Sequence, residues 1–413
     1  MDESRSADSA SLTTSKQSSI PQRGSGIPTS LLVLMSVAAG VVVANLYYNQ
    51  PLLSLMAHTF ALAPQWIGLV PTLTQIGYAV GMLLFIPLGD VADRRQLILT
   101  MSLLSIGALA ITALAPSFTV LAIASLAVGV FSIVPQLLVP LAAYLARPEE
   151  RGRAVGDVMS GLLVGILVAR TVAGTIGQHV GWRAMYWAAS GIMVLVTIAL
   201  WVMLPNVPGE SDHSYAELQR SLLQLIRKEP VLRESAFSGA MLFATFSAFW
   251  ATLVFLLVNP PYHYGSQVAG LFGLVGVIGA AAAPVAGRMA DKRDRRSNLR
   301  VAIVVVMVAF AVLLIWPRKL WGLIVGVILL DAGVQSGQVT NQSRIYSLTP
   351  EAHNRLNTVY MVTYFTGGAL GSAVGTLAWD HWHWPGVAVS GLTFCTATMA
   401  ALLRKRTPER SSR

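Results

Sequence analysis

The chain has 413 residues, of which 54% are hydrophobic and only 12% are charged, and its formal net charge is +10. Soluble domains carry about 25% charged residues, so this composition excludes a soluble protein and indicates an integral membrane protein. The apolar stretches are continuous rather than alternating, which excludes a transmembrane β-barrel. We therefore predict an all-α membrane protein.

Twelve stretches of the chain are long and apolar enough to span a bilayer, which takes about 20 mostly apolar residues per helix. Residues 1–28, before the first of them, are Ser-rich and lack an apolar core, as expected of a disordered tail and not of a signal peptide. The predicted spans are 29–50, 65–88, 96–115, 118–146, 154–178, 183–204, 236–258, 266–286, 299–316, 320–346, 356–379 and 385–403.

A polar segment separates the sixth and seventh predicted helices. Within it, residues 214–228 place apolar side chains on one helical face, and Ser214 with Glu217 matches a capping box. We predict an amphipathic helix at the membrane surface that joins two six-helix halves. The predicted domains are a tail (1–28), an N-terminal bundle (29–204), a cytoplasmic linker (205–235), a C-terminal bundle (236–403) and a second tail (404–413).

The positive charge is distributed unevenly along the chain. If the N-terminus lies in the cytoplasm, nearly all Lys and Arg residues fall in or beside segments on that side. The exceptions are Arg170, inside a predicted helix, and Arg183, Arg318 and Lys319 on the other side. This bias follows the positive-inside rule and predicts cytoplasmic termini. The basic charge is therefore a topology signal, and we expect no nucleic-acid partner.

The two halves repeat each other. GDVADRR (89–95) follows the second predicted helix, and GRMADKR (287–293) follows the eighth. PEERGR (148–153) and PEAHNR (350–355) follow the fourth and tenth. In this register the small residues Gly165, Ala169 and Ala173 match Gly367, Gly371 and Gly375. A parallel repeat of six helices is typical of transporters that bind their substrate near mid-membrane, between the halves.

These loops resemble the signature Gly-x-Leu-Ala-Asp-Arg-x-Gly-Arg-Arg of the major facilitator superfamily, and the resemblance covers nearly the whole chain. It implies a gating motif on the cytoplasmic side, in which an aspartate and basic residues form contacts that hold that side shut. Gln96 stands where the first copy would have its second glycine. The implied gating residues are Gly89, Asp93, Arg94, Gly287, Asp291 and Lys292.

Within the superfamily, the glycine-rich fifth helix and the segment YYNQPLL (47–53) look like the twelve-helix, proton-coupled efflux branch. The fifth helix has GILVARTVAG (165–174) where that branch has its Gly-Pro antiporter signature. The resemblance implies a transporter that usually works as a single chain.

Two charged residues lie deep inside predicted helices, away from their ends. Arg170 lies in the small-residue stripe of the fifth helix, and Asp331 lies near the middle of the tenth. A buried charge in a membrane costs several kcal/mol unless water or an opposite charge compensates it. We therefore expect both side chains to face a water-accessible crevice between the two halves.

Other polar residues are predicted to line the same cavity. Gln335, Gln338 and Gln342 continue one helical face from Asp331, and Gln136 occupies the position equivalent to Gln338 in the first half. Faces of the first and eleventh helices contribute further polar side chains. An aromatic stripe on the seventh helix contains Phe243, Phe246, Phe249 and Trp250. The further cavity candidates are Asn45, Tyr48, Asn49, Tyr360 and Tyr364.

Three interpretations of the two charges remain open at this point. In the first, Asp331 carries a proton and Arg170 is its electrostatic counterpart, so that a change in their separation loads and unloads the proton. In the second, they form a permanent ion pair that only fixes helix packing. In the third, Arg170 binds an anionic substrate.

The sequence favours a secondary active transporter that exports a small organic molecule in exchange for protons. A facilitator, or a proton-symporting importer of a small metabolite, is the near alternative. A membrane-embedded enzyme is a different class, but no nucleophile lies beside a base and no His, Asp or Glu cluster has metal-ligand spacing. We thus expect no cofactor or metal, a proton gradient as energy source, and a multi-pass protein of the plasma membrane, or of the inner membrane in a bacterium.

Overall fold

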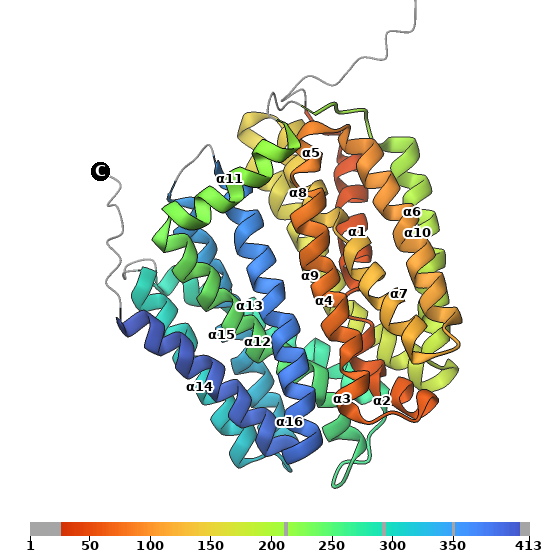
Figure 1. The fold of residues 1–413 in the computed structure, drawn as a ribbon, viewed down its shortest axis with the longest axis vertical. Helices are drawn as coiled ribbons and strands as arrows, with labels where there is room; N and C mark the ends of the chain where they lie inside the picture. The colour runs from red at the N-terminus through yellow and green to blue at the C-terminus, as the bar shows by residue number, and fades with distance from the viewer. Residues whose placement is uncertain (1–25, 210–213, 291–294, 349–351, 405–413) are drawn as a thin grey trace, which may run out of the picture.

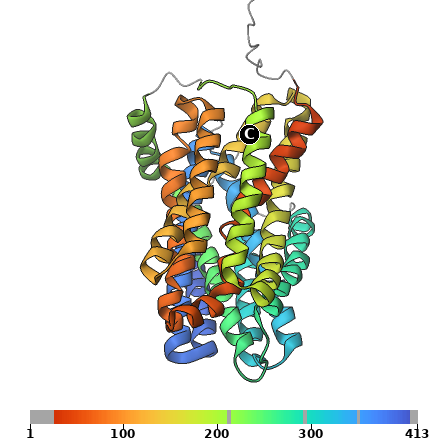
Figure 2. The same cartoon turned by 90° about the vertical axis from the view of Figure 1, so that its right-hand side faces the viewer.

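The computed structural model describes residues 26–209, 214–290, 295–348 and 352–404, with side chains described for all of these except 280–290 and 404. All regular elements in these ranges are helices. Most of them run along one axis in two bundles, with the N-terminal helices on the right of Figure 1 and the C-terminal helices on the left. Figure 2 shows the same parallel arrangement from the side. This is an all-α membrane fold of two six-helix bundles.

The first bundle contains three broken spans and three continuous ones. The broken spans are α1 (Thr29–Ala44) with α2 (Asn49–Phe60), α3 (Pro64–Ile67) with α4 (Leu69–Phe85) and α5 (Leu88–Val91), and α7 (Phe118–Phe131) with α8 (Val134–Leu145). The continuous spans are α6 (Arg94–Leu114), α9 (Arg151–Val180), which follows the short η1 (Pro148–Glu150), and α10 (Trp182–Met203).

Prolines explain where these spans break. A proline has no N–H, and its ring clashes with the carbonyl four residues earlier, so the helix ahead of it ends. Pro51 interrupts the helix at the turn between α1 and α2. Pro87 interrupts it between α4 and α5, and Pro135 interrupts it between α7 and α8. The predicted first span, 29–50, is therefore wrong at its end, because the chain turns after Ala44 and α2 continues to Phe60.

The second bundle contains α12 (Pro230–Val258), α13 (Ser266–Ala290), α14 (Arg295–Ile315), α15 (Leu320–Tyr346) and α16 (His353–Arg404). The long α16 is two helices joined across His383, whose φ of 53° is not helical. Pro385 follows two residues later and prevents a regular helix at this point. The break falls between the predicted spans 356–379 and 385–403.

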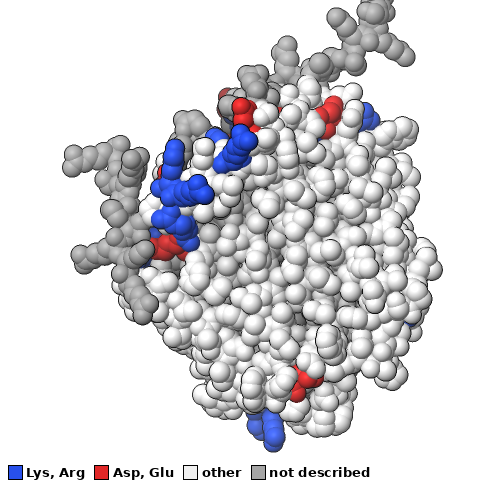
Figure 3. Space-filling view, viewed as in Figure 1, with Lys and Arg blue, Asp and Glu red and all other residues white. Residues whose placement is uncertain are grey.

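Ten helices in the described ranges are long and apolar enough to cross a membrane, if broken spans are joined and α16 is taken as one. The remaining span, α13, is apolar over Ser266–Gly279. On the face shown in Figure 3, charged side chains gather at the two ends, and a wide uncharged band lies between them. This distribution is what a bilayer requires of the protein around its hydrocarbon core.

Small residues allow close helix contacts at equivalent places in both bundles. In the first, a side chain added at Gly40 of α1 would meet the backbone of Gly161 in α9. In the second, side chains added at Gly367 and Gly371 of α16 would meet the backbone of Ala240 and Ala244 in α12. The predicted stripes therefore serve packing against the first helix of each half, as small residues commonly do in membranes.

The linker contains α11 (Tyr215–Lys228), which starts with the predicted capping box of Ser214 and Glu217. It crosses the end of the molecule at the top of Figure 1, from the first bundle to the second. We call this end the linker face and the opposite end the far face. Gln219 Nε2 donates to the Leu83 carbonyl at 2.7 Å, the carbonyl that Pro87 leaves without a helical donor. The linker thus completes the broken end of α4.

Candidate functional site

Arg170 lies at the contact between the two bundles. Its side chain on α9 is only 1% exposed. Its Nε donates to Gln50 Oε1 at 2.8 Å, within the first bundle. Its Cζ lies 3.9 Å from the ring centroid of Trp250 in α12, 5.0 Å from that of Tyr47 and 5.3 Å from that of Phe246. An amide and three aromatic rings therefore surround the guanidinium, and cation–π attraction is strong where water is excluded.

Glycines of α13 bring the charges together. A side chain at Gly273 would meet the Cβ of Arg170, and one at Gly276 would meet the carboxylate of Asp331. The two residues therefore flank the same stretch of α13, which packs between α9 and α15. Asp331 is 4% exposed, and its Oδ2 has no hydrogen-bond partner.

Arg170 and Asp331 interact through space without a direct bond. Each is among the charges that act on the other, yet no ion pair joins them among the described residues. The structure also differs from the predicted crevice, since both side chains are buried. In this state Gln50 and the rings stabilise Arg170.

The polar face of α15 contains Asp331 and, further along the helix, a residue that contacts α16. Gln335 and Gln338 are half-buried. Tyr364 donates its hydroxyl hydrogen to Gln338 Oε1 at 3.3 Å, and its ring stacks on Phe243 with centroids 4.1 Å apart. The predicted pair of Gln338 and Tyr364 is thus brought together beside the aromatic stripe of α12. Tyr360, fully buried, lies against Gly239 of the same helix.

The predicted face of the first helix does not reach this site. Asn45 donates to Ser105 and Ser132 at 3.3 and 3.4 Å, and Asn49 donates to Thr74 at 3.4 Å, all inside the first bundle. The prediction assumed one continuous helix, but residues 45–48 form a turn, which changes the direction of each side chain.

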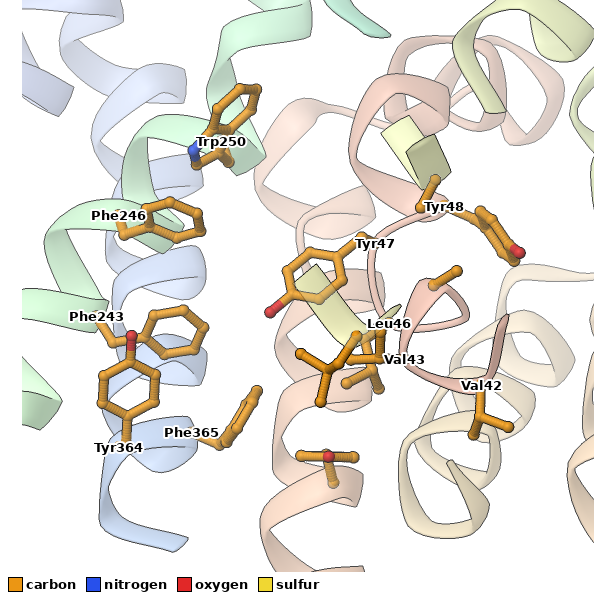
Figure 4. Close-up of a cluster of buried hydrophobic side chains, with 14 of the residues drawn as sticks. Val42, Val43, Leu46, Tyr47, Tyr48, Phe243, Phe246, Trp250, Tyr364 and Phe365 are labelled. Carbon is orange, nitrogen blue, oxygen red and sulfur yellow. The ribbon is translucent and has the colours of Figure 1, made fainter. Parts of the chain in front are cut away.

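Tyr47 takes the place predicted for Tyr48. Figure 4 shows its ring directed toward Phe243, Phe246 and Trp250, while the Tyr48 ring lies on the opposite side of the chain and points away from these rings. Gln50, the partner of Arg170, also lay outside the predicted set. Both residues belong to the segment 47–53, which the sequence analysis singled out.

Two amides form further contacts near the interface. Gln75 of α4, which the sequence reasoning missed, donates to Ser372 of α16 at 3.0 Å and accepts from Ser247 of α12 at 3.2 Å. It therefore joins the two bundles. Gln136 donates to the Tyr78 hydroxyl at 3.2 Å, and the Tyr78 ring packs on the Phe365 ring of α16. A buried polar residue inside a predicted helix was the signal for Gln75.

The loop motif of the first half stabilises local structure in this state. Asp93 caps its own helix, α6, by accepting from the Gln96 N–H at 2.9 Å. Arg94 donates to the Gly89 carbonyl at 3.1 Å. In the second copy, Asp291 and Lys292 lie outside the described residues, and Gly287 lies in the part of α13 described by its backbone only.

A buried ion cluster in the second bundle was not predicted. Glu234 Oε1 lies 2.9 Å from Arg344 Nη2, and Glu234 Oε2 lies 3.4 Å from Arg296 Nη2. Arg296 belongs to the basic run that follows the eighth predicted span. Its position joins the ends of α12, α14 and α15 at the linker face.

A groove of about 640 Å³ runs between α1, α9 and α10. Its walls include Val33, Val164 and Val168, which are exposed on the flank of the first bundle. Tyr48 lines it, whereas Arg170 and Asp331 do not. This groove therefore lies on the flank of the first bundle and is separate from Arg170 and Asp331.

Two repeated helical bundles that meet at a buried polar and aromatic interface define a membrane transport protein. The model of the Major Facilitator Superfamily matches residues 35–372. The chain belongs to this superfamily.

Similar proteins come from bacteria. The chain is 42% identical over 370 residues to the putative uncharacterized transporter YgaY of Escherichia coli K12, covering 90% of this chain and 94% of that protein. It is 33% identical over 377 residues to the probable transporter SCO4007 of Streptomyces coelicolor, covering 90% and 87%. Among solved structures, a mutant form of the nucleoside transporter NupG matches with a TM-score of 0.73 at 12% identity, covering 90% and 99%. That likeness shows the fold alone.

Proposed function

We propose that this protein is a secondary active transporter that exports a small organic molecule in exchange for protons. The observation that carries the proposal is Asp331, a buried carboxylate with an unpartnered oxygen, which flanks the same stretch of α13 as Arg170 and, among the described residues, forms no ion pair with it. A fixed ion pair would show a direct contact. The separation instead leaves Asp331 free to bind a proton.

The two charges belong to different bundles. Arg170 is hydrogen-bonded to Gln50 in the first bundle, and Asp331 lies on α15 of the second. A rocking motion of one bundle against the other changes the distance between them. Because charge interactions are strong where water is excluded, a small change in distance alters how readily Asp331 holds its proton. Proton binding and bundle movement are coupled in this way.

The described contacts favour a state closed at the far face. Gln178 Oε1 accepts from the Ser266 N–H at 2.9 Å, and Gly68 packs on Thr376. Both pairs join the bundles near the far ends of their helices. With the linker face in the cytoplasm, as the positive-inside rule favours, opening at the far face would release substrate outside. The transporter would act as a monomer in the bacterial inner membrane, without a cofactor.

Replacing Asp331 by Asn tests this proposal. Purified protein in liposomes with an imposed pH gradient is screened against a panel of small aromatic and amphipathic compounds, with substrate and internal pH followed together. Wild type accumulates a substrate against its gradient while protons move the opposite way. Asp331→Asn loses uphill transport but keeps exchange of labelled for unlabelled substrate. The exposed carboxylate of Asp157 provides the control, and Asp157→Asn retains both activities. Uphill transport by Asp331→Asn would remove Asp331 from the coupling role.

A further inference from the structure

We propose, on the basis of the exchange mechanism above, that the substrate is a neutral planar aromatic compound whose hydrogen-bond acceptor is held by Arg170 and Trp250. Two observations carry this inference. The first is a pair of buried donors without acceptors, and the second is an aromatic wall beside them.

The donors are Arg170 Nη2 and Trp250 Nε1. Neither has a hydrogen-bond partner, and the two side chains are 1% and 2% exposed. Buried donors are normally satisfied, so each such case needs an explanation. The guanidinium carbon lies 3.9 Å from the indole centroid, so the two donors belong to side chains in direct contact. Because Arg170 lies on α9 and Trp250 on α12, an acceptor bound here also joins the two bundles.

The aromatic wall continues from Trp250 along α12 to α16. The Phe243 and Phe246 rings are stacked at 5.5 Å with 19° between their planes, and Tyr364 stacks on Phe243 with 16° between planes. Figure 4 shows these rings on one side of the interface and Tyr47 facing them from the other. When the bundles separate, flat faces on both sides become available to a planar ring.

The net charge of the site favours a neutral ligand over an anionic one. Arg170 and a deprotonated Asp331 together carry no net charge. An anionic substrate would bind best when Asp331 is protonated, so substrate and proton would move in the same direction, which is symport. Exchange requires the substrate to bind the deprotonated site, and this favours a neutral acceptor. The protein uses such an acceptor itself, since the Gln50 amide carbonyl accepts from Arg170 Nε at 2.8 Å.

Three probes that share one ring system separate these possibilities: 2-naphthamide, 2-methylnaphthalene and 2-naphthoate. They differ only in carrying a neutral acceptor, no acceptor or an anion. Equilibrium dialysis of the purified full chain in lipid nanodiscs measures their affinities at neutral pH. We expect 2-naphthamide to bind about tenfold more tightly than 2-methylnaphthalene, equivalent to about 1.4 kcal/mol, and more tightly than 2-naphthoate.

Trp250→Phe keeps an aromatic ring under Arg170 and removes the indole N–H together with the rest of the pyrrole ring. It should weaken the binding of 2-naphthamide more than that of 2-methylnaphthalene, whereas a folding defect would weaken both alike. Trp187→Phe, on the exposed flank of α10, is the matched control and should behave as wild type.

Equal affinities for 2-naphthamide and 2-methylnaphthalene would contradict the proposed acceptor-binding site, whether or not transport is coupled to protons. Tighter binding of 2-naphthoate, accompanied by proton uptake in the same direction, would overturn the neutral substrate. Selective binding of 2-naphthamide, with transport that does not respond to the pH gradient, would contradict the exchange mechanism. The proposed acceptor-binding site would then still be supported.

Discussion

Arg170 Nε and Gln50 Oε1 form a 2.8 Å hydrogen bond in the buried interface between α9 and α2. This bond holds the guanidinium against the first bundle and directs its face onto Trp250 of the second. A neutral amide thus positions a permanent positive charge near a carboxylate without neutralising it. In the mechanism proposed above, Arg170 acts on Asp331, and its other nitrogen binds the substrate.

Gln50→Leu removes the acceptor and leaves a buried guanidinium N–H unsatisfied. An unsatisfied buried donor costs about 1–3 kcal/mol, so we expect a lower Tm in detergent. Gln224→Leu, on the exposed side of α11, should leave Tm unchanged. An unchanged Tm in Gln50→Leu would mean that Arg170 finds another partner, and a structure of the variant would show whether that partner is Asp331.

Glu234→Gln removes the carboxylate between Arg296 and Arg344. Breaking a buried pair by deleting one partner costs about 3–5 kcal/mol, so a large drop in Tm and in yield is expected. The exposed pair of Arg153 and Asp157, 3.8 Å apart, offers the contrast, since such surface pairs contribute at most about 1 kcal/mol. Asp157→Asn should have little effect. Equal stability of the two variants would contradict a structural role for the cluster.

Cysteines at Gly68 and Thr376 should cross-link the far face. A side chain at Gly68 would contact Thr376, so the pair needs only a small adjustment to reach disulfide geometry. In a Cys395→Ala background, oxidation of Gly68→Cys/Thr376→Cys should stop transport, and reductant should restore it. Thr376→Cys alone should be insensitive to oxidant. Transport by the fully cross-linked protein would mean that the far face does not need to open.

Gln219→Leu should loosen the linker-face end of α4. The Leu83 carbonyl would lose its 2.7 Å donor, which leaves the bond from Tyr215 to the Leu84 carbonyl beside the apolar packing of α11. Hydrogen exchange should become faster in residues 86–92, and Gln224→Leu serves as the matched control. Unchanged protection in this segment would show that apolar packing of α11 is sufficient.

Local patterns predicted much of the fold. Each span is a long apolar run, and its existence follows from its own composition because a bilayer accepts no unpaired backbone. The capping box at Ser214 depends on two residues only three positions apart, so the sequence also predicted it correctly. The helix breaks at Pro51 and Pro135 were visible as prolines, but the resulting change in side-chain direction was not.

The sequence likewise predicted some features of the candidate site and not others. Arg170 and Asp331 stand out in apolar runs, since a charge in a membrane is costly wherever it points. Tyr47 and Tyr48 are neighbours of one type, and which of them meets Trp250 depends on the turn at residues 45–48.

By itself the sequence determined that this chain is a membrane protein of twelve helices in two related halves with two charges inside, because apolar length, repetition and charge are properties of the chain itself. Only the tertiary structure decided that Gln50 and Trp250 hold Arg170, that Gln75 joins the bundles and that Glu234 is clustered with two arginines. These partners lie far apart in the chain, and packing alone selects which faces meet.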